Sequence, residues 1–156
     1  MDRLTATIEA PPAATWQLII DNAEPGELFT IGFQAWVTYK LQNVAELGWR
    51  RAGDTGHIDA MTYLAFMLEG RGDLDEAETW YRRAADTGNP TPMCNLGGWL
   101  RGRGNLDEGE TWYRRAAEAG DTRAMSNLGV LLQKRGDINE AETWHRRAAE
   151  ADDTAP

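Results

Sequence analysis

The sequence predicts an all-α protein, an α-solenoid of tandem helix-turn-helix repeats. Three stretches that begin at Ala77, Gly109 and Ala141 are nearly the same and lie 32 residues apart: AETWYRRAADTG, GETWYRRAAEAG and AETWHRRAAEAD. The segments before them also match one another: AMTYLAFMLEGRGDLDE, PMCNLGGWLRGRGNLDE and AMSNLGVLLQKRGDINE. Within each unit, apolar and small residues recur at helical spacing. A fixed period of this length is typical of repeat architectures.

The N-terminal part departs from the repeat. Residues 1–26 have no copy elsewhere, and PPAATWQLIIDNA predicts one helix after the proline pair that caps the array. Residues 27–56 hold a fainter copy, with AELGWRRAGDTG from Ala45. Its first half needs a one-residue shift, because Phe33 stands near the place of Ala65, Gly97 and Gly129. We interpret 27–56 as a degenerate first repeat.

Residues 57–152 hold three clear repeats, each of two helices, and residues 153–156 form a tail. In the first helix of a repeat the apolar stripe falls at i, i+3, i+4 and i+7, and the second helix has its own stripe. In the first clear repeat the two stripes are Met61, Leu64, Ala65, Leu68 and Leu74, Ala77, Tyr81, Ala84. The small residues that we expect to face each other are Ala65 with Ala77, Gly97 with Gly109, and Gly129 with Ala141. They allow the two helices to approach closely.

The tripeptide Arg71-Gly72-Asp73 resembles a cell-adhesion signal but recurs at the seam between the helices of each repeat, once with Asn105 in place of Asp. Glycine is preferred after a helix end because it adopts the left-handed conformation without a Cβ penalty. Asp or Asn then suits the N-cap of the next helix. Glu76, Glu108 and Glu140 follow three residues later and predict a capping box. We therefore interpret the tripeptide as a turn.

Composition excludes several classes of protein. The net charge of −9 disfavours nucleic acid and an acidic membrane surface as partners. The single cysteine, Cys94, cannot form an intramolecular disulfide or a thiolate metal cage. The first residues lack the apolar core of a signal peptide, and no stretch approaches the roughly 20 apolar residues of a membrane helix. We expect a cytoplasmic protein.

The repeat resembles the tetratricopeptide repeat. The ending WYRRAAxxG followed by AMxNLG is most similar to the Sel1-like branch of that superfamily, although the period of 32 is shorter than the usual one of about 34. The resemblance implies a concave face that holds proteins or peptides, and it implies no catalysis.

If the groove follows the family, side chains of the first helices line it. The residues that we expect there are Thr62, Phe66, Cys94, Asn95, Arg101, Arg123, Asn127, Val130 and Gln133. This set suits a peptide with one apolar anchor and an acidic group near Arg101 or Arg123. Asn95 and Asn127 resemble the asparagines that clamp carboxylates in some tetratricopeptide domains, but the accompanying lysines are missing, so we do not expect such a clamp.

The tryptophans divide into two sets. Trp80, Trp112 and Trp144 recur at one place of the repeat and predict packing between repeats, whereas Trp16, Trp36 and Trp99 break the pattern and are candidates for a binding surface. In the last helix, Trp144, His145 and Ala148 have no following repeat to cover them. From this we expect a self-association face, with a homodimer formed through the C-terminal repeat.

The charged residues predict structure rather than chemistry. Arginine pairs recur every 32 residues, but Glu78, Glu110 and Glu142 precede Arg82, Arg114 and Arg146 by four, the favourable order for helical ion pairs. Asp107, Glu108 and Glu110 lie in or near the first turn of a helix, where negative charge suits the dipole.

The sequence holds no phosphate loop, no metal-ligand spacing and no nucleophile with a base. His57 and His145 are far apart in sequence, so we expect no catalytic residue, metal or cofactor. The predicted function is a non-catalytic scaffold that binds a protein or peptide. The alternative is a protein that binds or sequesters a cationic aromatic molecule in a closed pocket between Trp36, Phe66 and Trp99.

Overall fold

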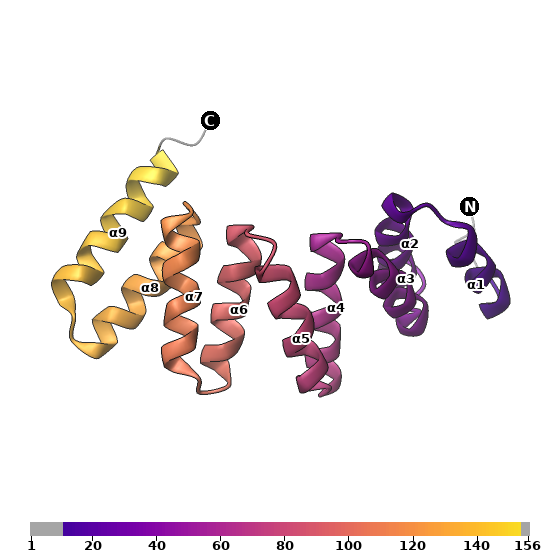
Figure 1. The fold of residues 1–156 in the computed structure, drawn as a ribbon, viewed down its shortest axis with the longest axis horizontal. Coiled ribbons are helices and arrows are strands. Elements are labelled where there is room, and N and C mark those ends of the chain that lie inside the picture. Colours follow the sequence, from indigo (N-terminus) through magenta and orange to yellow (C-terminus); the bar gives the residue numbers. More distant parts are fainter. Residues whose placement is uncertain (1–10, 154–156) are drawn as a thin grey trace, which may run out of the picture. The chain divides into compact units, whose positions relative to one another are not determined.

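The computed structural model describes residues 11–153, and over that range it contains nine α-helices and no strand (Figure 1). The helices are α1 (Ala13–Asn22), α2 (Pro25–Val37), α3 (Gln42–Asp54), α4 (Ile58–Arg71), α5 (Leu74–Ala85), α6 (Pro90–Gly102), α7 (Leu106–Glu118), α8 (Thr122–Arg135) and α9 (Ile138–Asp153). Residues 1–10 of the predicted cap and 154–156 of the predicted tail lie outside this range. Asp153, the first residue of that tail, is the last residue of α9.

The chain divides into two compact units that meet in sequence between Arg71 and Gly72. In unit 1, which contains α1–α4, α3 packs against α1, α2 and α4. In unit 2, which contains α5–α9, each helix packs against the next one along the chain. Antiparallel neighbours joined by short turns are the expected arrangement for helical repeats.

The helix predicted after the proline pair is α1. Trp16 and Ile20 are its buried residues, and the Trp16 ring meets that of Tyr39 at 5.6 Å. Arg51 of α3 donates a hydrogen bond to the carbonyl of Ile20 at 3.1 Å and forms an ion pair with Asp21 at 2.6 Å. An arginine that satisfies the last carbonyls of a helix stabilises its C-terminal end.

Left-handed glycines set the turns. Gly72, Gly104 and Gly136 have φ of 92°, 84° and 95°, so the turn interpretation of the tripeptide is confirmed. Its arginine is engaged as well, because Arg71 forms an ion pair with Glu46 at 2.7 Å.

The predicted capping boxes are wrong for α5 and α7, whose N-cap residues make no side-chain cap hydrogen bond. Instead, the amide of Asn105 donates to the carboxylate of Glu108 at 2.9 Å. Side-chain caps occur at the first helices of the repeats. Asn89 accepts from the backbone of Thr91 at 3.0 Å, and Asp121 accepts from that of Ala124 at 2.7 Å.

Within a repeat, a ring of the second helix lies over a glycine of the first. A Cβ on Gly97 would lie 2.9 Å from the ring of Tyr113 and 3.0 Å from the carbonyl oxygen of Gly109. A Cβ on Gly129 would lie 2.6 Å from the ring of His145. The expected close approach of Gly97 and Gly109 is therefore confirmed, and His145 is a half-buried packing residue.

The first repeat uses the same device one residue earlier. A Cβ on Gly32 would lie 2.7 Å from the indole of Trp49, and one on Gly48 would lie 3.2 Å from the Cα of Gly32. The close approach therefore falls at Gly32, which explains the one-residue shift in the sequence. Phe33, the next residue, is exposed.

Candidate functional site

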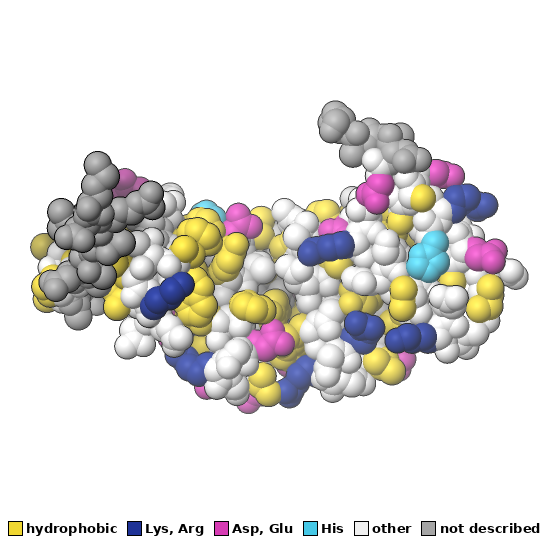
Figure 2. Space-filling view, turned by 180° about the vertical axis from the view of Figure 1, so that it is seen from behind, with side chains coloured by type: hydrophobic (Ala, Val, Ile, Leu, Met, Phe, Trp, Pro, Cys, Tyr) yellow, Lys and Arg dark blue, Asp and Glu magenta, His cyan; other side chains and the backbone are white. Residues whose placement is uncertain are grey.

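Unit 1 carries a group of exposed apolar side chains on two of its helices, which we call the aromatic patch. It consists of Phe33 and Val37 on α2 and of Tyr63 and Phe66 on α4, which are 39%, 46%, 42% and 65% exposed. Hydrophobic side chains gather over the N-terminal helices towards the left of Figure 2. Clustered large apolar side chains on a soluble protein are typical of an interaction surface.

Stacked rings support the aromatic patch from below. Phe29 meets Tyr63 at 5.7 Å and stacks on His57 at 4.6 Å, while Tyr63 also meets Trp49 at 5.5 Å. Nδ1 of His57 accepts a hydrogen bond from the backbone nitrogen of Ala60 at 3.3 Å, which caps the start of α4. The contacts with Phe29 and Trp49 hold the ring of Tyr63 in place before any partner arrives.

A cleft of about 240 Å³ adjoins the patch. Its lining consists of Trp36, Gln42, Phe66, Met67, Gly70 and Arg71. Trp36 is half-buried and meets Trp49 at 5.9 Å. Trp99 is absent from this lining, and Arg71 supplies a positive charge to it. The cleft does not match the pocket that a cationic aromatic molecule requires.

The first helices of unit 2 present polar groups in place of rings. Arg123 donates to the side-chain oxygen of Asn95 at 3.2 Å, and Arg101 and Asn127 are exposed. Val130 and Gln133 are exposed as well. In unit 1, Thr62 is half-buried beside Phe66, and its hydroxyl donates to the carbonyl of Ile58 at 3.1 Å.

Cys94 does not line a surface, so this part of the groove prediction is wrong. The side chain is buried, and the amide of Asn127 donates to its sulfur at 3.8 Å. Burial, together with the nearby Asp121 carboxylate, raises the pKa of the Cys94 thiol to about 11. The thiol therefore remains protonated at neutral pH and is a poor nucleophile.

The other buried candidates also require correction. Trp16 and Trp99 are buried rather than on the surface. Trp16 of α1 packs against the ring of Tyr39, and Trp99 meets the ring of Tyr81 at 5.8 Å. Trp144 and Ala148 are buried in unit 2, so with the half-buried His145 they do not form an exposed self-association face.

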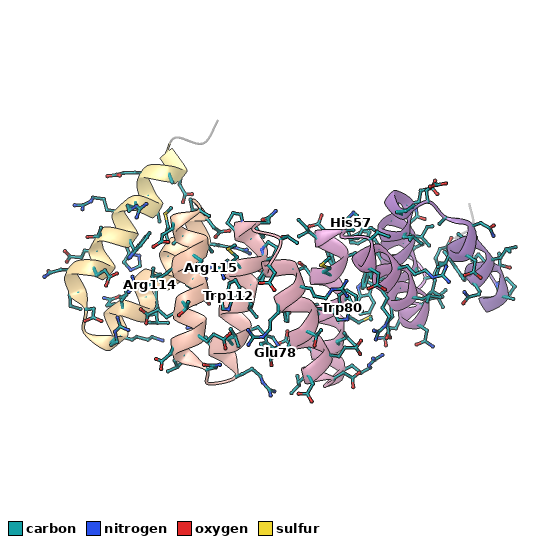
Figure 3. All side chains as sticks on the ribbon, viewed as in Figure 1. His57, Glu78, Trp80, Trp112, Arg114 and Arg115 are labelled. Carbon is teal, nitrogen blue, oxygen red and sulfur yellow. The ribbon has the colours of Figure 1, made fainter. Side chains whose placement is uncertain are left out.

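Trp80, Trp112 and Trp144 of the second helices are buried, and each lies between two charged residues. Arg83, Arg115 and Arg147 stack over the rings of Trp80, Trp112 and Trp144 at 4.1, 4.3 and 4.4 Å. The indole nitrogens donate to Glu76, Glu108 and Glu140 at 3.4 Å. Figure 3 labels Trp112 and Arg115, which lie together on α7.

In two of these pairs, the first arginine links its own helix to the next repeat. Arg82 contacts Glu78 at 2.7 Å and Glu108 at 2.5 Å. Arg114 likewise contacts Glu110 at 2.9 Å and Glu140 at 2.5 Å. Hydrogen bonds from these arginines hold the pKa values of Glu108 and Glu140 below the usual glutamate range. The predicted Glu-first pairing is therefore confirmed at Arg82 and Arg114.

Neither a metal centre nor a membrane span is found in the described part of the chain. Residues 11–153 contain no group of three or more His, Cys, Asp or Glu side chains that could hold an ion. Within the same range no helix has the length and apolar character needed to cross a bilayer.

Two family models match the sequence. The tetratricopeptide repeat model matches residues 57–88 and 122–151, and the Sel1 repeat model matches residues 93–121. No curated protein sequence matches the chain.

Several solved structures share the fold. The crystal structure of MamA is 18% identical with a TM-score of 0.68, and the match covers 90% of this chain and 86% of MamA. A Sel1 repeat protein from Oxalobacter formigenes is 27% identical with a TM-score of 0.66, and the match covers 81% of this chain and 57% of that one. The protective antigen c5321 of uropathogenic Escherichia coli, described as having an SLR fold, is 26% identical with a TM-score of 0.68.

The match to c5321 covers 88% of this chain and 32% of the antigen, so the chain spans about a third of that protein and little more than half of the Oxalobacter one. These likenesses confirm the predicted fold class of helical repeats. Together the two family models cover more than half of the sequence. The chain therefore belongs to the tetratricopeptide repeat superfamily and carries a repeat of the Sel1-like branch.

Proposed function

We propose that the chain is a non-catalytic scaffold that binds a protein or peptide, with the aromatic patch of unit 1 as its apolar anchor. Repeats of these two families generally serve as protein–protein interaction scaffolds. The observation that carries the proposal is the exposure of Phe33, Val37, Tyr63 and Phe66 on two helices whose other large apolar side chains are buried or half-buried.

The patch has the properties of a binding hot spot. Aromatic side chains at the centre of an interface often contribute most of its affinity. The rings beneath Tyr63, namely Phe29 and Trp49, hold it in place, so little side-chain freedom is lost on binding. Phe66, the most exposed of the four, borders the adjoining cleft.

In the same proposal, the first helices of unit 2 supply hydrogen-bonding side chains and the apolar Val130 to the partner. The proposed contact residues there are Asn95, Arg101, Arg123, Asn127, Val130 and Gln133. In unit 1, Thr62 lies beside Phe66 and Trp36 borders the cleft, so both join the proposed contacts. The scaffold role involves no chemical step.

A displayed library of short peptides, selected on the whole chain, tests the proposal. Each enriched peptide is then measured on Phe66→Ser and on Leu106→Ser. The second variant is a matched control, because Leu106 is 56% exposed but lies on α7 of unit 2. We expect enriched peptides to lose at least tenfold in affinity on Phe66→Ser and to bind the control normally. The proposal is overturned if every enriched peptide binds Phe66→Ser with the same affinity as the unchanged chain. Circular dichroism must show that both variants are folded.

A further inference from the structure

Helices α8 and α9 (Figure 1) carry a second surface, which consists of Ser126, Glu142, Arg146 and Ala149 and which we call the end face. We infer that the end face binds a helix-turn-helix segment of another protein, in which an arginine and a glutamate stand five residues apart on either side of the turn. The inference goes beyond the proposed function, because the end face lies in unit 2 and the aromatic patch lies in unit 1.

The junction between α7 and the pair α8–α9 shows how such a segment is held. Glu110 of α7 contacts Arg135, the last residue of α8, at 2.6 Å. Arg114 of α7 contacts Glu140, near the start of α9, at 2.5 Å, and it also contacts Glu110 at 2.9 Å. The four side chains form one network of alternating charge. Arg135 and Glu140 stand five residues apart, so the incoming helix pair presents a positive and a negative charge at a fixed spacing.

The same contacts recur elsewhere in the chain. Arg82 of α5 contacts Glu108 of α7 at 2.5 Å, as Arg114 contacts its glutamate in the next repeat. In unit 1, Glu46 of α3 contacts Arg71 at the end of α4 at 2.7 Å, as Glu110 contacts its arginine. A second helix of a repeat therefore receives the next helix pair through one glutamate and one arginine, four residues apart.

The end face carries this glutamate and arginine without a partner. Glu142 and Arg146 of α9 stand 32 residues after Glu110 and Arg114. Both side chains are exposed, whereas the Glu110 side chain is only 12% exposed. In the part of the chain that the structure describes, neither Glu142 nor Arg146 forms a side-chain ion pair or hydrogen bond. The two charges are therefore available to a segment with the complementary pair.

The small side chains of the end face are uncovered as well. Ala85 and Ala117, each followed along the chain by another repeat, are fully buried, whereas Ala149 at the same repeat position is exposed. Cys94 of α6 is buried, whereas Ser126 at its place in α8 is exposed. Small residues at these positions let a helix approach closely, so the end face suits a helical partner in shape and in charge.

A second copy of this chain does not supply the required pair at its N-terminal end. The positions equivalent to Arg135 and Glu140 in the first repeat hold Tyr39 and Val44. Helix α1 also packs against the second helix of that repeat. The partner is therefore a different polypeptide, whose exposed helix-turn-helix segment carries the arginine and the glutamate.

Two synthetic helical hairpins test the inference. The first has the sequence of residues 121–153 with Glu142→Ala and Arg146→Ala, so that copies of the hairpin do not stack on one another. The second carries Glu140→Arg in addition. Hydrocarbon staples keep both hairpins helical, which circular dichroism verifies. Their affinities for the whole chain are measured by fluorescence anisotropy.

The chain variants are Arg146→Glu and, as a matched control, Lys134→Glu. Lys134 is exposed on α8, and the residues at its repeat position, Gly70 and Gly102, are also exposed although another repeat follows each of them. The control therefore makes the same kind of charge reversal outside the end face. Circular dichroism checks that both variants are folded.

We expect the first hairpin to bind the unchanged chain and Lys134→Glu equally, and to lose at least fivefold in affinity on Arg146→Glu, because two carboxylates then meet. The Glu140→Arg hairpin should recover that loss on Arg146→Glu to within about threefold, since the two sites interact directly. Absence of binding by the first hairpin, or a loss that the second hairpin does not recover, overturns the inference. A chain that is a dimer by light scattering and becomes a monomer with Arg146→Glu also overturns it, because a second copy then occupies the end face.

Discussion

The helix pair α2–α3 in unit 1 and the pair α6–α7 in unit 2 have the same topology but differ in the side chains at two positions of the second helix. In α7, Trp112 is buried, Arg115 lies over its ring and Glu108 accepts from its indole nitrogen. In α3 the corresponding positions hold Gly48 in place of the tryptophan and Val44 in place of the glutamate. The second helix of a repeat can therefore lack this tryptophan where another helix packs against it.

The contacts of the arginine at one repeat position identify that other helix as α1. Arg115 stacks on Trp112, whereas Arg51, at the same repeat position, has no tryptophan beside it and instead binds the end of α1 through Ile20 and Asp21. Helix α1, which lies outside the repeats, is thus held by Arg51, a residue of the first repeat. The first repeat thus has glycine at the repeat position of the tryptophan and α1 packed against its second helix.

Removing the indole from unit 2 should have the largest effect. Trp112→Ala is expected to lower the free energy of unfolding by about 3–5 kcal/mol, because a large buried side chain is replaced by a cavity. Denaturant unfolding followed by circular dichroism measures it. Leu106→Ala, at an exposed position of the same helix, should change stability by less than about 0.5 kcal/mol. A loss below about 1 kcal/mol for Trp112→Ala would contradict the role of this ring in packing.

Two glycine substitutions compare a close contact with backbone and a close contact with a side chain. Gly97→Ala places a Cβ 3.0 Å from the backbone oxygen of Gly109, so α6 and α7 must separate, at a cost of about 1–3 kcal/mol. Gly129→Ala meets the imidazole of His145, which can turn away, and should cost under about 1 kcal/mol. Thermal unfolding of both variants compares them directly. Equal losses would show that the His145 ring is held as firmly as backbone.

Substituting the two equivalent arginines separates a local effect from a global one. Arg51→Ala should raise the hydrogen exchange of the α1 amides about fivefold, since it removes roughly 1 kcal/mol of interaction at a partly exposed site. Arg115→Ala should instead lower the unfolding free energy of the whole of unit 2 by about 0.5–1 kcal/mol. Exchange mapped along the chain by mass spectrometry distinguishes the two patterns. Unchanged exchange of α1 in Arg51→Ala would break the proposed link between α3 and α1.

The smallest expected effect is on acid stability. The hydrogen bond from Arg82 lowers the pKa of Glu108, so this interaction stabilises the fold above the ordinary glutamate value of 4.5 and is lost as pH falls through the lower value of the folded state. Glu108→Gln should therefore lose less stability on acidification than the parent, by under about 1 kcal/mol. Unfolding at neutral and acidic pH measures the difference. Asp107→Asn serves as the exposed control. If the stability of Glu108→Gln had the same pH dependence as that of the parent, the stabilising role of the Arg82–Glu108 interaction would be refuted.

Features that depend on one helix or on the period were predictable from the sequence. The 32-residue repeat indicated the helix pairs, and the four-residue spacing of Glu78 and Arg82 fixed an ion pair, because both depend on local helical geometry. The reach of Arg82 to Glu108 depends on how one repeat stacks on the next, and the sequence alone does not give that distance.

Exposure was the least predictable property. Trp99 departs from the repeat pattern and was expected at the surface, yet it is buried against Tyr81. Tyr63 and Phe33 were missed because α4 is apolar on more than one side and the first repeat is shifted by one residue. The signal for Tyr63 was present, since it stands three residues before Phe66 on the same side of α4.

The left-handed glycines have a consequence for how such a chain changes length. They stand at positions 56, 72, 88, 104, 120 and 136, so every second one begins the same kind of turn. A genetic deletion or duplication between two such points, for example from Gly72 to Gly104, joins backbone of matching conformation and keeps both neighbouring helices in phase. Whole units are thus expected to be gained or lost more readily than single residues, and the length of the array becomes a trait that selection can adjust in steps.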